Sequence, residues 1–169
     1  ITETFVSYAA ACLAAGASGL FFTPTKLASA DVMTVEQYRE FGIPYDLRVL
    51  AAVQNRPGFN LLHLCGDNIF FDELMGYPVD AISWDTTLPG NPSLRDGRAR
   101  SGKAVVGGIS HRSTLSAGTP QQVADEVARG IAETGGRGYV IAPGCTFPTT
   151  TRRDMLEAAL SARDQFGSV

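Results

Sequence analysis

Short apolar runs alternate with helical patterns along the whole chain, and this alternation limits the possible folds more than any other feature. The apolar runs are expected to be strands, and we place five of them, at 19–23, 59–63, 79–84, 103–108 and 138–142. Strands that alternate with helices are joined by right-handed crossovers, so the strands run parallel. The sequence therefore predicts an α/β fold with a parallel sheet.

Capping residues and glycines set the expected helix boundaries. A helix over 2–15 should end before Gly16, and Thr34 with Gln37 predicts a capping box at the start of a short helix. Thr119, Pro120 and Gln122 open a helix that should run to about Thr134. The remaining helices are expected at 44–54, 69–75, 91–100 and 151–166.

Two architectures accommodate this order of elements. One is an open, doubly wound five-stranded sheet, and the other is part of a (β/α)8 barrel, which typically takes about 250 residues. Both place their chemistry at the carboxyl ends of the strands. With 169 residues and no linker-like stretch, residues 1–169 are expected to form a single domain.

Composition excludes several classes of partner. The net charge of −3 leaves no basic footprint for nucleic acid, and no apolar run reaches the roughly 20 residues of a membrane span.

The N-terminus carries Glu3 and lacks the basic region of a signal peptide. The chain does not begin with methionine, so it is expected to be processed or a fragment. Three widely spaced cysteines form no disulfide framework, which favours a reducing, cytoplasmic setting.

Residues with metal-binding or acid–base chemistry follow four of the five predicted strands. Both histidines and two of the three cysteines fall at these strand ends. The residues concerned are His63, Cys65, Asp85, His111, Arg112 and Cys145.

The first candidate site is a zinc centre. A catalytic zinc typically has three protein ligands and one open position, and His63, Cys65 and Cys145 could supply the three. Gly66 lets the backbone bend so that side chains two residues apart converge. The alternative is a turn histidine and two unrelated cysteines, and spacing alone favours that alternative.

The other candidates are supporting residues. Asp85 could act in catalysis by binding substrate, or could orient His63 through a hydrogen bond, but a turn or N-cap aspartate is an equal alternative. His111 and Arg112 could contact an anionic group of a substrate or cofactor, although an ordinary solvated loop also accounts for them.

The order of sequence motifs resembles the uroporphyrinogen decarboxylase family. The motifs are "AAGASGLFF", "VEQYREFGIPY", "HLCG", "VDAISWD" and "TPQQVADEVARGIAETGGRGYVIAPGCTFP". The resemblance covers nearly the whole chain but only the C-terminal part of the family's (β/α)8 barrel. It implies that the five strands are the last five β/α units of eight, a partial TIM barrel.

Within that family, "HLCG" and "PGC" resemble the zinc-dependent methylcobalamin:coenzyme M and related corrinoid methyltransferases. This resemblance implies Zn²⁺ on His63, Cys65 and Cys145, a methylcobalamin or corrinoid-protein methyl donor, and a small thiol as acceptor. The decarboxylase branch is similar to this chain but has the pattern Gly-His-Gly at the place of Gly144-Cys145-Thr146. The histidine of that pattern is therefore absent here.

The predicted function is therefore methyl transfer from a methylated corrinoid to a thiol, weak or absent in this chain alone. The alternatives are a decarboxylase-like enzyme that acts on a porphyrinogen without a metal, and a non-catalytic half-barrel. Five parallel strands of a partial barrel leave two open edges, which predicts a homodimer or aggregation through them.

Overall fold

The computed structural model describes residues 1–54 and 58–167. The chain divides into two compact units, Ile1–Ile82 and Ser83–Val169, and each is described by itself below. The expectation of a single domain over 1–169 stays a prediction.

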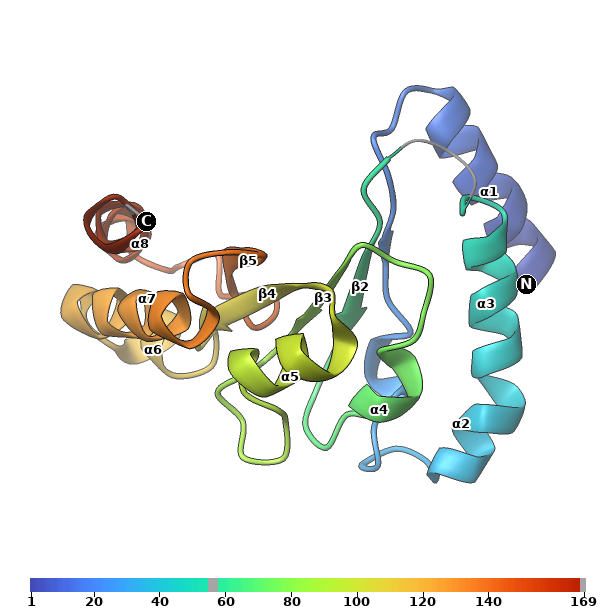
Figure 1. Ribbon diagram of the computed structural model, residues 1–169, viewed down its shortest axis with the longest axis horizontal. Helices are drawn as coiled ribbons and strands as arrows, with labels where there is room; N and C mark the ends of the chain where they lie inside the picture. The colour runs from blue at the N-terminus through green and yellow to red at the C-terminus, as the bar shows by residue number, and fades with distance from the viewer. Residues whose placement is uncertain (55–57, 168–169) are drawn as a thin grey trace. The chain divides into compact units, whose positions relative to one another are not determined.

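The N-terminal unit packs helices around the first two strands. In chain order its elements are α1 (Thr2–Ala14), β1 (Phe21–Phe22), a 3-10 turn η1 (Thr25–Leu27), α2 (Val35–Phe41), α3 (Ile43–Ala51), β2 (Leu61–Leu64) and α4 (Phe71–Leu74). Helices α1 and α3 lie side by side (Figure 1). The predicted capping box of Thr34 and Gln37 is present at the start of α2.

The first strand differs from its expectation. A strand was expected over 19–23, but β1 pairs with β2 only through Phe21 and Phe22. The side chain of Phe21 is 67% exposed. Among the described strands β1 lies at one end of the sheet, so one of its two edges has no strand neighbour.

A half-buried carboxylate links separate segments of the N-terminal unit. Asp46 in α3 accepts hydrogen bonds from the hydroxyls of Tyr38 in α2 (2.5 Å) and Tyr77 (2.9 Å). Burial raises the pKa of Asp46, and the two hydrogen bonds oppose that rise. The carboxylate thus ties together segments that are far apart in sequence.

The C-terminal unit contains the longest helices of the chain. Strand β3 (Ala81–Trp84) crosses the boundary between the units, and α5 (Leu94–Ser101), β4 (Ala104–Ile109), α6 (Thr114–Ala117), α7 (Pro120–Thr134), β5 (Tyr139–Pro143) and α8 (Arg153–Phe166) follow. Helix α7 packs against α8 and against β4 (Figure 1). Strands β4 and β5 are parallel, in a register from Val105 opposite Tyr139 to Ile109 opposite Pro143.

Two glycines let α7 approach the sheet. The Tyr139 ring fills the space where a Cβ on Gly108 or on Gly130 would stand, 2.3 Å from the hydroxyl oxygen in both cases. That hydroxyl donates to the carbonyl oxygen of Gly107, 3.1 Å away. A larger residue at either glycine would therefore push the tyrosine out of its place between helix and sheet.

The strand order decides between the two predicted architectures. The five strands lie in the sheet as β1-β2-β3-β4-β5, with no reversal of order. A doubly wound sheet reverses its order at a switch point, whereas a (β/α)8 barrel adds strands in sequence. The parallel sheet with helices is therefore a partial barrel, as expected.

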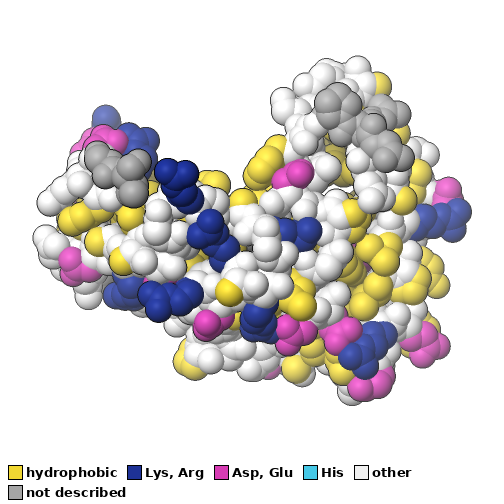
Figure 2. Space-filling view, viewed as in Figure 1, with side chains coloured by type: hydrophobic (Ala, Val, Ile, Leu, Met, Phe, Trp, Pro, Cys, Tyr) yellow, Lys and Arg dark blue, Asp and Glu magenta, His cyan; other side chains and the backbone are white. Residues whose placement is uncertain are grey.

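Two surface properties bear on partners. Among residues 1–54 and 58–167, no helix is long and apolar enough to cross a membrane. Hydrophobic side chains lie exposed over α3 of the N-terminal unit, including Tyr45 and Leu47 (Figure 2).

Candidate metal centre

Strand β2 carries the first candidate ligand. His63 is the third residue of β2 and is buried, with 7% of its surface exposed. Its imidazole stacks on the ring of Phe21 in β1, with ring centroids 5.6 Å apart and planes 28° apart. Phe21 pairs with Leu61 at the start of β2, so the edge strand β1 carries the ring that stacks on the imidazole.

The chain turns immediately after β2. Cys65 follows the strand and is partly buried, and Gly66 has φ +103°, a conformation that residues with a side chain rarely adopt. The predicted bend after the histidine is therefore present. It places Cys65 at the strand end, two residues beyond His63.

The third candidate ligand comes from the end of β5. Gly144 follows the strand, and its N–H donates to the carbonyl oxygen of Ile109 in β4 (2.9 Å). A Cβ at Gly144 would stand 2.7 Å from Cα of Asp85 and 2.6 Å from its Cγ. Only glycine permits this close approach, which fixes the backbone that carries Cys145.

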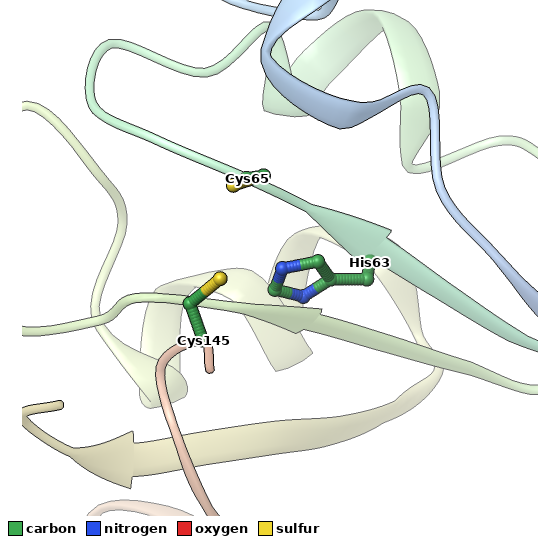
Figure 3. Close-up of side chains that lie close together, drawn as sticks. All are labelled: His63, Cys65 and Cys145. Carbon is green, nitrogen blue, oxygen red and sulfur yellow. The ribbon is translucent and has the colours of Figure 1, made fainter. Parts of the chain in front are cut away.

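The three predicted ligands form a group. One ligand atom from each of His63, Cys65 and Cys145 lies within 4.8 Å of the other two. The imidazole of His63 and Sγ of Cys145 point toward one another (Figure 3). None of the three cysteines, all within the described residues, is in a disulfide.

Asp85 and His111 form a second pair within the C-terminal unit. Oδ2 of Asp85 lies 3.2 Å from Nδ1 of His111, and the two side chains are 2% and 13% exposed. The other carboxylate oxygen, Oδ1, accepts from the backbone N–H of Thr87 (2.9 Å) and from its hydroxyl (2.6 Å). Asp85 is thus a turn residue, one of its predicted roles, and also the partner of a histidine.

Helix α7 makes hydrogen bonds to the loop that carries His111. Glu126 accepts from the N–H of Ser110 (3.0 Å) and from the hydroxyl of Thr114 (2.8 Å), on either side of the histidine. The hydroxyls of Ser110 and Ser113 are 2.7 Å apart. The segment predicted as a long loop is therefore braced at both ends, and α6 begins within it.

Sequence reasoning missed two contributors to this region. Glu126 lies on the same face of α7 as the buried Val123 and Val127, and a glutamate on an apolar face is the signal that could have revealed it. Phe21 was assigned only to a strand. Of the predicted residues, Arg112 is exposed beside His111 and is not part of the His63, Cys65 and Cys145 group.

Comparisons with known proteins agree with this organisation. The family model described as Uroporphyrinogen decarboxylase (URO-D) matches residues 1–166. A curated protein of Methanosarcina barkeri, named methylcobamide:CoM methyltransferase MtaA, is 28% identical over 98% of this chain and 47% of its own length. The MtaA of Methanosarcina barkeri strain Fusaro is 29% identical over 97% of the chain and 46% of its own length.

A solved structure shows the same fold. A methyltransferase from Methanosarcina mazei superposes with a TM-score of 0.83 at 25% identity, over 98% of this chain and 47% of that one. The chain thus spans about half the length of the relatives that it matches.

Proposed function

Because the chain belongs to the uroporphyrinogen decarboxylase (URO-D) family, and because two curated relatives are named methyltransferases, we propose that it is part of a zinc-dependent methyltransferase. The proposed reaction moves a methyl group from a methylated corrinoid, free or protein-bound, to a small thiol. The observation that carries the proposal is the group formed by His63, Cys65 and Cys145.

The donor atoms of this group suit zinc. Imidazole nitrogen and thiolate sulfur are the ligands that zinc prefers, whereas magnesium and calcium prefer oxygen. Around a tetrahedral zinc, with Zn–S near 2.3 Å and Zn–N near 2.0–2.1 Å, ligand atoms lie about 3.5–4 Å apart. The three side chains offer one nitrogen and two sulfur donors within 4.8 Å of one another, which is a ligand set of this kind.

Three protein ligands leave one tetrahedral position for a substrate. Zinc supplies Lewis acidity that stabilises a bound thiol as thiolate at neutral pH. The Cys65 and Cys145 thiolates bring two negative charges to the site, so a thiolate bound beside them keeps its electron density and remains nucleophilic. The ring of Phe21 stacks on the imidazole of His63, which favours one plane of that candidate ligand.

Thiol coordination can be tested on this chain without turnover. Chelator-washed protein is loaded with Co²⁺ in place of zinc and titrated with 2-mercaptoethanol. We expect an increase in the near-ultraviolet thiolate-to-cobalt charge-transfer absorption, with saturation at one thiol per metal. The same titration with 2-(methylthio)ethanol is the matched control, since a thioether cannot form a thiolate. An unchanged spectrum with the thiol would contradict the proposal.

We also propose that the chain associates through its two terminal strands. Strands β1 and β5 stand at the ends of the sheet order, and Val140 in β5 is 48% exposed. Edge strands with exposed apolar residues template pairing with another chain, and a lysine on the edge discourages it. Light scattering should give a mass above that of one chain, and Val140→Lys should lower it.

Val32→Lys is the control for this measurement, because Val32 is equally exposed (50%) but lies outside any strand. It should leave the mass unchanged. A monodisperse monomer for the unaltered chain would contradict association through the edges.

A further inference from the structure

Thiol methylation releases a proton, and one imidazole of the chain is placed to receive it. The reacting thiol loses its hydrogen when sulfur becomes the nucleophile. The chain has two histidines. His63 is in the ligand group, where a metal-bound nitrogen cannot accept a proton, while His111 lies outside that group.

The position of His111 follows from the strand register. Ile109 of β4 is opposite Pro143 of β5, so His111 and Cys145 each stand two residues beyond a paired position. The Gly144 N–H bond to the Ile109 carbonyl continues this alignment past the strand ends. The loop that carries His111 therefore emerges beside the backbone that carries the ligand Cys145, within one unit.

Asp85 connects these two segments. Its backbone and carboxylate lie against Gly144, and its Oδ2 is 3.2 Å from Nδ1 of His111. Oδ2 of Asp85 is buried from solvent. The other carboxylate oxygen, Oδ1, accepts hydrogen bonds from the N–H and the hydroxyl of Thr87. A carboxylate beside Nδ1 favours the tautomer that is protonated there, which leaves the lone pair on Nε2.

Hydrogen bonds on both sides of His111 also fix its backbone. Glu126 bonds to Ser110 and Thr114, on both sides of His111. A general base is effective when a third group orients it and its backbone is fixed.

We propose that His111, held by Asp85, is the base that accepts the proton of the acceptor thiol. The inference rests on the proposed function, since it concerns the same reaction. The S–H bond breaks, its electron pair stays on sulfur, and a new N–H bond forms at Nε2. The imidazolium is stabilised by the Asp85 carboxylate, and no electron transfer is needed.

Imidazole NMR tests this proposal directly because only two histidines give signals. Zinc-loaded protein labelled with ¹⁵N in histidine is studied near pH 8, above the ordinary imidazole pKa of about 6.5. His111→Gln assigns the signals. We expect His111 to show protonated Nδ1 and unprotonated Nε2, and Nε2 to shift to the protonated position when 2-mercaptoethanol is added. 2-(Methylthio)ethanol, which has no proton to give, should cause no such shift.

Two variants separate the role of Asp85 from a general loss of charge. Asp85→Asn should mix the tautomers of His111 and abolish the thiol-dependent shift. Asp125→Asn removes an exposed carboxylate from the same unit, on α7, and should change neither.

The outcomes distinguish this proposal from the one on which it rests. If the thiol binds cobalt but His111 stays neutral, or if His111 is already protonated before thiol is added, His111 is not the base, and methyl transfer at the metal stands. If the thiol does not bind the metal, both proposals fall. Protonation of His111 that depends on both the thiol and Asp85 supports the assignment.

Discussion

Replacing Cys65 by alanine should lower the zinc content of chelator-washed, zinc-reconstituted protein from about one ion per chain to nearly none. The substitution removes one of three donor atoms that lie within 4.8 Å of one another. Two remaining ligands do not make a catalytic zinc site, which typically has three. The loss of affinity should exceed the roughly 10- to 100-fold that removal of a residue supporting a ligand typically costs.

Cys12→Ala is the matched control, because Cys12 lies on α1 and is not in the ligand group. Elemental analysis and competition with a chromophoric chelator give both stoichiometry and affinity for the two variants. Equal zinc affinity in Cys65→Ala and the unaltered chain would remove Cys65 from the site. Loss of zinc in both variants would point to a general effect of thiols rather than to this centre.

Replacing Gly144 by alanine should both destabilise the protein and weaken zinc binding. The new Cβ would stand 2.7 Å from Cα of Asp85 and 2.6 Å from Cγ, closer than real Cβ contacts, so the backbone before Cys145 or the turn at Asp85 has to move. Overpacking of this kind typically costs about 1–3 kcal/mol. The same displacement carries Cys145 away from His63 and Cys65.

Urea unfolding followed by the fluorescence of the single tryptophan measures the loss of stability, since Trp84 is fully buried next to Asp85. Gly76→Ala is the control, because a Cβ there meets no heavy atom within 4 Å. It should change the free energy of unfolding by no more than about 0.5 kcal/mol. An unfolding midpoint and zinc affinity equal to those of the unaltered chain would show that Gly144 has no such role.

Local signals in the sequence were sufficient for the order and type of the main elements. Thr34 with Gln37 forms the expected capping box, and Thr119 and Gln122, expected to open a helix, form a second one, because both partners of a box lie within one helical turn. The boundaries of other helices shifted where a different capping residue is used. Helix α5 was expected from residue 91 but begins at Leu94, because Ser93 is its N-cap and accepts a hydrogen bond from the N–H of Asp96.

Burial and pairing were harder to predict because they depend on partners far along the chain. The apolar run 19–23 looks like a strand buried on both faces, yet Phe21 is 67% exposed at the edge of the sheet. Helix α6 has only four residues, too short to show a period. The contact between Asp85 and His111 joins residues from two strand ends, and neither residue carries a local sign of the other.

The candidate ligands could be named from the sequence. His63, Cys65 and Cys145 follow predicted strands, and the motifs that contain them resemble those of zinc-dependent methyltransferases; one ligand atom from each lies within 4.8 Å of the other two. Glu126 accepts a hydrogen bond from the loop that carries His111, and Phe21 stacks on His63. Residue type alone does not reveal these contacts.

If the chain assembles through β1 as proposed, the stacking of Phe21 on His63 would link metal affinity to assembly. Phe21 belongs to the edge strand β1 and stacks on the imidazole, so a partner that covers this strand would also contact a neighbour of the candidate ligand. A partner that orders Phe21 lowers the entropy that zinc binding must remove from the histidine. By reciprocity, bound zinc strengthens the attachment of that partner by the same factor. Zinc affinity should therefore rise with protein concentration.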